Sequence, residues 1–71
     1  MSTEFPKGEM KVLRCLVRGL SYNEIAKELG IEPSTVKYHV INMLQKTGLE
    51  NKLQLAIAAS EAKLVVELAE E

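Results

Sequence analysis

The sequence has little of the chemistry on which enzymes and metal sites depend. Its 71 residues include one Cys and one His, Cys15 and His39, which fall in different predicted helices. One cysteine cannot form an internal disulfide, and two such residues are too few to coordinate a structural zinc ion. There is no glycine-rich phosphate loop and no converging set of carboxylates. We therefore expect neither an enzyme nor a metalloprotein, and no cofactor.

The chain also lacks the length and the apolar runs that other classes of protein need. It is sufficient for one domain, residues 1–71, with a modest core and no room for a small-molecule pocket of ordinary size. No apolar stretch is long enough to span a membrane, and no secretory signal pattern opens the sequence. We interpret Cys15 as a small core residue of a first helix over about residues 7–18, and not as a reactive thiol. These features predict a cytoplasmic protein without membrane contacts.

A surplus of positive charge is missing as well. The formal net charge is −1, from nine Lys or Arg and ten acidic residues. Residues 1–52 carry eight Lys or Arg and six acidic residues, whereas residues 53–71 carry one and four. The C-terminal part therefore sets the overall sign, and the rest of the chain is only weakly basic. If the chain binds nucleic acid, we expect weak non-specific binding with a shallow salt dependence.

A helix, a glycine and a second helix are predicted between Ser21 and Thr47. The apolar positions that indicate the two helices are Ile25, Ala26, Leu29, Val36, Val40, Met43 and Leu44. Gly30 lies between the two patterns, where it can adopt the positive φ that ends a helix without a Cβ clash. Ser21 with Glu24 fits a capping box, and Pro33 suits the first turn of the second helix. This arrangement predicts a helix-turn-helix, which fits the major groove of DNA.

The second of these helices, predicted over about residues 33–47, has an outer face without a carboxylate. At about 100° per residue, Val36, Val40 and Met43 share its core-facing side. The opposite side carries one cation, polar groups and two larger side chains, namely Ser34, Lys37, Tyr38, Ile41, Asn42 and Gln45. Because an acidic side chain there would repel phosphates, this composition favours DNA binding.

Particular contacts with DNA follow from the positions on this helix. Lys37 is the best candidate to contact a guanine edge or a nearby phosphate, while Tyr38 and Ile41 point most directly into the groove, where Ile41 would touch a thymine methyl. Ser34 and Thr35, at the helix N-terminus, would hold a phosphate. The complete set of predicted DNA contacts is Ser34, Thr35, Lys37, Tyr38, Ile41, Asn42, Gln45, Lys46 and Lys52.

The later residues of this region have supporting roles in the prediction. We expect Asn42 and Gln45 to hydrogen-bond to bases or phosphates, and Lys46 and Lys52 to clamp the DNA backbone. His39 falls at the border of the core-facing side. We interpret it as a packed, hydrogen-bonded histidine that also reaches a phosphate, and not as a metal ligand or a catalytic base.

Residues across nearly the whole chain resemble the signature of LuxR/GerE-type DNA-binding domains. The matching positions of the helix-turn-helix region are Glu24-Ile25-Ala26, Leu29, Ile31, Thr35-Val36-Lys37, His39, Lys46 and Gly48. The resemblance extends upstream to Glu9 and downstream to Leu64-Val65, and it covers about residues 5–65. It implies an all-α, compact four-helix domain with a central helix-turn-helix. It also implies a stand-alone, GerE-like regulator of transcription that binds double-stranded DNA as a homodimer.

Several positions depart from this signature. Pro6 and Gly8 stand where a capping threonine and an arginine are usual, so the first helix should begin loosely and one phosphate contact should be missing. Glu32 replaces a frequent Ser or Thr cap, Lys52 a frequent Arg, and Lys63 a frequent Gly, which would let the last helix continue. These departures bear on DNA affinity and specificity more than on the fold.

The last helix has more apolar surface than one small domain needs. We predict that it begins near Asn51 and Gln54 and runs over about residues 52–69. Its apolar residues form two stripes, Leu55, Ala56 and Ala59 toward the domain and Leu53, Ile57, Leu64 and Leu68 beside them. The second stripe has the spacing of a seam between helices, so we favour a homodimer that reads a two-fold symmetric site. The alternative is that both stripes surround a single core.

A second class of function stays open at this point. The same fold would suit a domain that binds RNA polymerase or another regulator, as the weak positive charge and the outward Ile41 suggest. A DNA-binding domain should lose affinity on Lys37→Ala, whereas a protein-binding module should lose its partner when Leu64 or Leu68 becomes charged. Many proteins of the LuxR type carry a sensing domain before the helix-turn-helix, but Met1 favours a stand-alone regulator over a piece of a longer chain.

Overall fold

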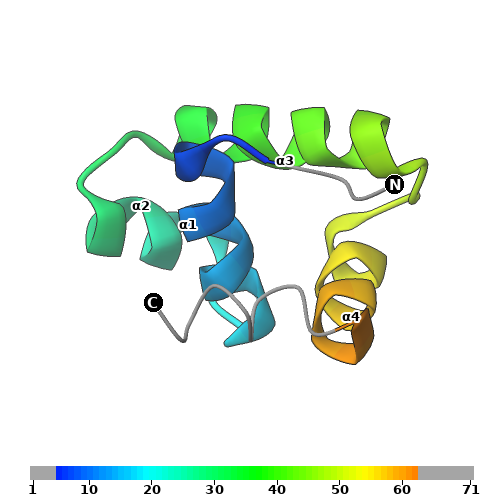
Figure 1. Cartoon of the computed structure of the whole chain (residues 1–71). Coiled ribbons are helices and arrows are strands. Elements are labelled where there is room, and N and C mark those ends of the chain that lie inside the picture. The colour runs from blue at the N-terminus through cyan, green and yellow to red at the C-terminus, as the bar shows by residue number, and fades with distance from the viewer. Residues whose placement is uncertain (1–4, 63–71) are drawn as a thin grey trace.

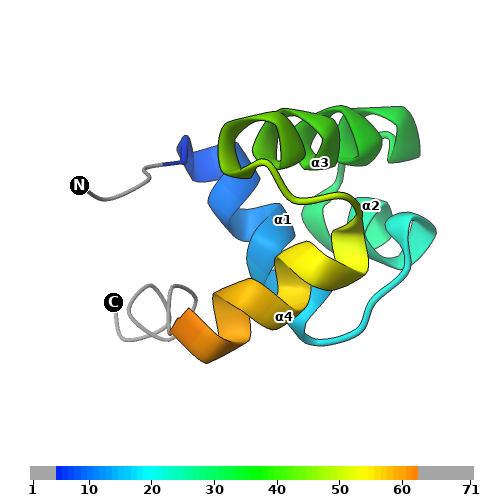
Figure 2. The ribbon, with the colours of Figure 1, turned by 90° about the vertical axis from the view of Figure 1, so that its right-hand side faces the viewer.

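Four helices and no strand make up residues 5–62, the part of the chain that the computed structural model describes. They are α1 (Lys7–Val17), α2 (Tyr22–Leu29), α3 (Pro33–Thr47) and α4 (Lys52–Ala62). α3 lies across one end of the domain, α1 runs away from it, and α2 and α4 lie on either side of α1 (Figures 1 and 2). The all-α, four-helix class expected from the sequence is confirmed. The expected continuation of the last helix to residue 69, with Leu64 and Leu68, lies outside the described residues.

Short-range side-chain hydrogen bonds fix where two of the helices begin. Ser21 and Glu24 form the predicted capping box at α2, in which each side chain accepts from the backbone N–H of the other residue, at 3.2 and 2.8 Å. At α4 the backbone N–H of Gln54 donates to the side-chain oxygen of Asn51 at 2.9 Å. α1 begins after Pro6 without a side-chain cap. That start agrees with the loose beginning expected of the first helix.

Gly30 turns the chain between α2 and α3. Its backbone lies in the left-handed region, with φ 71° and ψ 35°, as predicted for this position. The N–H groups of Gly30 and Ile31 then both donate to the carbonyl oxygen of Ala26, the latter at 3.0 Å. Both bonds end on one carbonyl group in the last turn of α2, after which the chain leaves the helix and begins α3 at Pro33.

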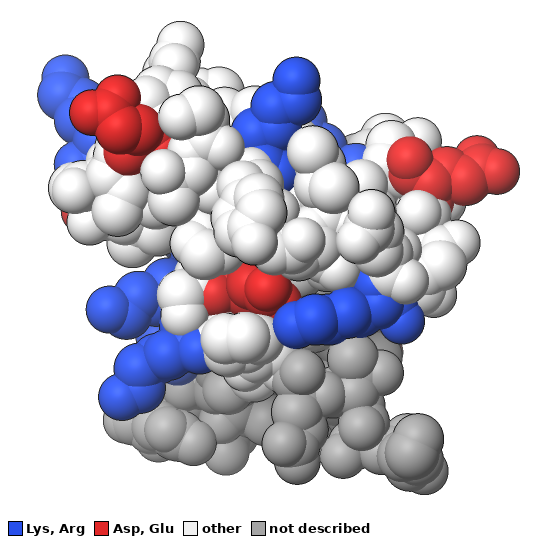
Figure 3. Space-filling model, turned by 90° about the horizontal axis from the view of Figure 1, so that it is seen from above, with Lys and Arg blue, Asp and Glu red and all other residues white. Residues whose placement is uncertain are grey.

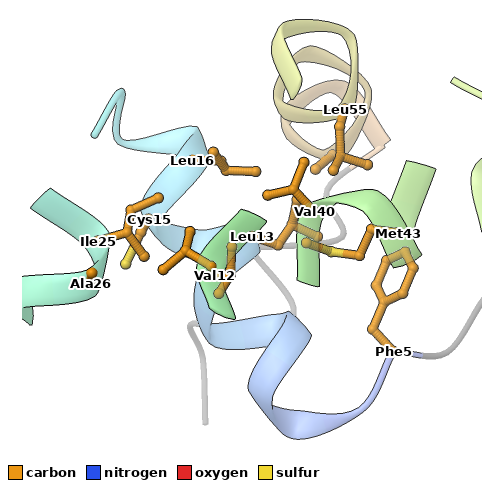
Figure 4. Packing of buried hydrophobic residues seen from close by; sticks show 12 residues of the cluster. Phe5, Val12, Leu13, Cys15, Leu16, Ile25, Ala26, Val40, Met43 and Leu55 are labelled. Carbon is orange, nitrogen blue, oxygen red and sulfur yellow. The ribbon is translucent and has the colours of Figure 1, made fainter. Parts of the chain in front are cut away.

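The core is an apolar cluster to which all four helices contribute. Its buried members are Phe5, Val12, Leu13, Cys15, Leu16, Ile25, Ala26, Val36, Val40, Met43, Leu55 and Ala59. Side chains of α1 occupy its middle, with Ile25 of α2 on one side and Val40 and Leu55 toward the other (Figure 4). Cys15 is buried in this cluster, as predicted, whereas Val17 of the same helix is only half-buried. The core therefore contacts one side of α3 and leaves the opposite side exposed to solvent.

Candidate nucleic-acid interface

α3 is fixed to the domain by one apolar side. Val36, Val40 and Met43 are almost completely inaccessible to solvent, and they lie along the side of α3 that faces α1. At its C-terminal end the hydroxyl of Thr47 donates to the carbonyl oxygen of Met43 at 2.9 Å. The N–H of Gly48 donates to the carbonyl oxygen of Leu44 at 2.8 Å, which closes the helix. The core thus limits the rotation of α3 about its axis.

The outer side of α3 brings most of the predicted contact residues onto one surface. Tyr38 is 62% exposed and Ile41 42% exposed, although both are large side chains with apolar parts. Ser34, Lys37 and Gln45 are exposed beside them. The two other predicted contacts of this helix, Thr35 and Asn42, are half-buried and lie at the margin of the face. No Asp or Glu occurs within α3.

The three lysines that the sequence predicts to contact DNA differ in their surroundings. Lys37 is exposed and has no ion-pair partner among residues 5–62. Lys46 is paired with the carboxylate of Glu9, at 2.8 Å between Nζ and Oε1. Lys52 lies on α4, away from the other contact residues in sequence, and its Nζ is 4.2 Å from the centre of the Tyr22 ring. Burial raises the pKa of the Tyr22 hydroxyl, so this ring is neutral at physiological pH.

His39 corrects one expectation from the sequence. Its side chain is half-buried, as expected, but its Nδ1 is buried and has no hydrogen-bond partner within the described part of the chain. The ring lies against Gly8 of α1, where an added Cβ would come within 3.3 Å of two ring atoms. Because Gly8 has no side chain, the imidazole ring of His39 can pack directly against α1. Packing, rather than a hydrogen bond, fixes the position of this ring.

Charge is distributed sparsely over the surface that carries α3. Seen from this side, most of the described surface belongs to neither acidic nor basic residues, and the Lys and Arg side chains form several small areas and no continuous patch (Figure 3). Arg18, at the far end of α1, is paired with Glu28 at 2.6 Å. This arrangement agrees with the sequence-based expectation of a weakly basic domain.

Glu9 belongs to this region, although no sequence pattern predicted it there. It is a buried carboxylate on α1, and it contacts Lys46 from a position 37 residues away. Its helical spacing from Val12, Leu13 and Leu16 puts it on the core-facing side of α1. A carboxylate on the core-facing side of a helix needs a cation as its partner. This position of Glu9 is the sequence signal that could have indicated an ion pair.

α4 exposes an apolar strip on its outer side. Leu53 is 66% exposed and Ile57 47% exposed. Both residues line a shallow groove between α1 and α4, together with Val17 and Ala56. Exposure of large apolar side chains next to a groove is typical of a surface that another chain covers. The other two residues predicted for this strip, Leu64 and Leu68, lie outside the described residues.

The described residues contain neither a metal-binding cluster nor a membrane-spanning helix. No group of three or more His, Cys, Asp or Glu within residues 5–62 has a geometry that could hold a metal ion. Over the same range, every helix is too short or too polar to cross a membrane.

The four helices, with α2 and α3 joined by a glycine turn, define a small helix-turn-helix domain. The chain belongs to the luxR family of bacterial regulatory proteins, whose GerE sequence pattern matches residues 5–59. The resemblance stated from the sequence is therefore confirmed.

Several characterised bacterial proteins are similar to the chain. It is 44% identical over 50 residues to the transcriptional regulatory protein UhpA of Salmonella typhimurium, covering 70% of this chain and 26% of UhpA. It is 38% identical over 61 residues to the regulatory protein SdiA of Escherichia coli, covering 86% of this chain and 25% of SdiA. The nitrate/nitrite response regulator protein NarL of Escherichia coli is 34% identical over 56 residues, or 79% of this chain and 26% of NarL. The chain thus spans about a quarter of the length of these relatives.

Proposed function

We propose that the chain is a sequence-specific DNA-binding domain of a transcriptional regulator and places α3 in the major groove of double-stranded DNA. The observation that carries this proposal is the outer face of α3, which is exposed, contains no carboxylate and stands opposite an apolar side anchored in the core. A helix mounted in this way presents side chains to base edges while the rest of the domain stays clear of the groove. Transcriptional regulators among its relatives support the same role.

The proposed contacts divide into those that read bases and those that hold phosphates. Lys37, Tyr38 and Ile41 are placed for the bases, with Ile41 against a thymine methyl group. Asn42 and Gln45 supply hydrogen-bonding groups beside them. The residues proposed for phosphates are Ser34 and Thr35, at the N-terminus of α3, and Lys52. Lys46, also predicted from the sequence to clamp a phosphate, is paired with the carboxylate of Glu9.

We also propose that two copies associate through α4. The exposed pair Leu53 and Ile57 supports this, because one small core leaves both uncovered. Leu64 and Leu68 would continue the same strip. A two-fold dimer would place two α3 helices about one DNA turn apart and read a two-fold symmetric site. For this role we propose that the protein acts in the cytoplasm.

Fluorescence anisotropy with a labelled mixed-sequence duplex tests the proposal. Binding should weaken as salt is raised, and Lys37→Ala should cost about 1–3 kcal/mol at a selected site if Lys37 makes a bidentate base contact. Lys11→Ala is the matched control, because it removes an exposed lysine of α1 and leaves α3 unchanged. Folded protein that binds no duplex at low salt would overturn autonomous DNA binding.

A protein-interaction domain is the second candidate. The separated cations and the exposed apolar pairs on α3 and α4 favour a protein partner such as RNA polymerase or another regulator. In that case Lys37→Ala should leave the partner bound, whereas a charge at Ile57 should release it. Binding of RNA polymerase that survives a charge at Ile57 would count against α4 as the docking surface.

A further inference from the structure

Glu9 is a charged side chain in an apolar position. Its side chain is only 5% exposed, and it belongs to the same side of α1 as Val12 and Leu13, which are fully buried. An isolated carboxylate at such a position is costly, and a buried charge of this kind is normally paired. The partner is Lys46, whose Nζ lies 2.8 Å from the Glu9 carboxylate. The ion pair therefore joins α1 to the last turn of α3.

Lys46 is held on more than one side. Besides the carboxylate of Glu9, the ring of Phe5 lies 5.6 Å from Nζ, within the range of a cation–π contact. The side chain is 38% exposed, so it stays partly accessible to solvent while its Nζ is paired with Glu9. A phosphate that approached Lys46 would have to compete with a carboxylate at hydrogen-bond distance.

The start of α1 contacts α3 at two points along its length. Gly8 lies against the ring of His39, and the neighbouring Glu9 binds Lys46. His39 and Lys46 are seven residues apart and share one side of α3, about 10 Å apart along the axis. Two contacts on one line restrict rotation of α3 about its axis. That rotation decides the direction of the outer residues Tyr38 and Ile41.

We propose that Lys46 is a positioning residue, whose charge is neutralised by Glu9 and which fixes the rotation of α3 in place of clamping a DNA phosphate. This inference rests on the proposed function, because the face that it orients is the proposed DNA-reading face. It assigns to Glu9 a role in DNA recognition without any contact to DNA. It also leaves Lys37 as the main cation of α3 that is available to the nucleic acid.

The salt dependence of DNA binding separates a positioning lysine from a phosphate clamp. The double variant Glu9→Gln/Lys46→Gln removes one charge of each sign and keeps the net charge. If Lys46 is neutralised by Glu9, the slope of log K against log salt should equal that of the wild type. A lost phosphate contact would instead make the slope shallower by about 0.9. Lys37→Gln is the control, for which this decrease is expected.

The double variant should lose sequence specificity even though the slope of log K against log salt stays that of the wild type. In the double variant the preference for a selected duplex over a mixed-sequence duplex should fall about tenfold, equivalent to about 1.4 kcal/mol. A purely structural pair would leave this ratio unchanged in folded protein, as judged by circular dichroism. The single variant Lys46→Arg, which keeps a cation beside Glu9, should retain the wild-type ratio. A shallower slope in the double variant, or an unchanged ratio, would overturn the inference.

Denaturation tests the ion pair without DNA. Lys46→Met leaves the buried carboxylate of Glu9 unpaired, so it should lower the urea midpoint more than Glu9→Gln/Lys46→Met does. Equal midpoints for these two variants would show that Glu9 and Lys46 are not coupled and would overturn the positioning role. A wild type that binds no duplex would overturn the proposed function and, with it, the statement about phosphates. The comparison of urea midpoints would still decide whether Glu9 and Lys46 join α1 to α3.

Discussion

Gly30 determines how closely α3 follows α2. Its φ of 71° lies in the left-handed region, where a Cβ costs about 1–2 kcal/mol and asparagine is tolerated better than alanine. An added Cβ would meet no atom within 4 Å, so only the backbone conformation opposes a substitution. We expect Gly30→Ala to lower the free energy of unfolding by about 1 kcal/mol and Gly30→Asn by less. Urea denaturation followed by circular dichroism measures both, and an Ala variant as stable as the wild type would contradict this account of the turn.

Cys15 is predicted to be an unreactive thiol. Burial raises its pKa, the nearby carboxylate of Glu28 raises it further, and Arg18 opposes this effect. Because the thiolate is the reactive form, a raised pKa means a smaller reactive fraction at neutral pH than an ordinary thiol has. We expect a disulfide reagent to modify folded protein much more slowly than urea-unfolded protein, with the folded rate increasing as the pH becomes alkaline. Equal rates in both states at neutral pH would show that Cys15 is accessible.

At the scale of the elements, α4 exposes large apolar residues outside the proposed DNA-reading face of α3. Leu53 and Ile57 lie on its outer side, while Leu55 and Ala59 of the same helix are buried in the core. Leu53 and Ile57 therefore contribute little to the fold of one protomer. A change there should affect association and leave folding intact.

We expect Ile57→Glu to convert a dimer to a monomer while its helix content stays that of the wild type. The physical reason is that a carboxylate would be desolvated at the proposed seam between two α4 helices. Sedimentation equilibrium measures the mass, and Leu55→Ala serves as the contrasting variant, since truncation of this buried residue should lower stability by about 2–5 kcal/mol. A wild type that is already monomeric at high concentration would contradict dimerisation through α4.

Local signals were sufficient to predict the helices from the sequence, whereas contacts between helices were not. The capping residues Ser21 and Glu24 and the turn residue Gly30 act within a few positions of one another, so the start and end of α2 can be predicted directly. The pairing of Glu9 with Lys46 spans 37 residues and depends on how α1 meets α3. For this reason the sequence indicated Lys46 as a cation near DNA but could not show that a carboxylate already binds it.

At the scale of the whole molecule, few positive charges are available to DNA. The net charge is −1, and Arg18 and Lys46 are engaged in ion pairs. With about three phosphates neutralised per protomer, the slope of log K against log salt should be about −3 per protomer. Titrations of a mixed-sequence duplex at several salt concentrations measure this slope. A slope as steep as about −6 per protomer would mean that many more cations reach the DNA than the structure provides.

The most direct test of the account is to map the DNA-binding surface by two-dimensional NMR of isotopically labelled protein during addition of a duplex at low salt. The account predicts that the largest chemical-shift changes occur at the outer side of α3, at Lys37, Tyr38, Ile41 and Gln45. The buried residues Val40 and Met43 should change little. Changes confined to α4, or none at all in folded protein, would contradict the claim that α3 is the surface that reads DNA.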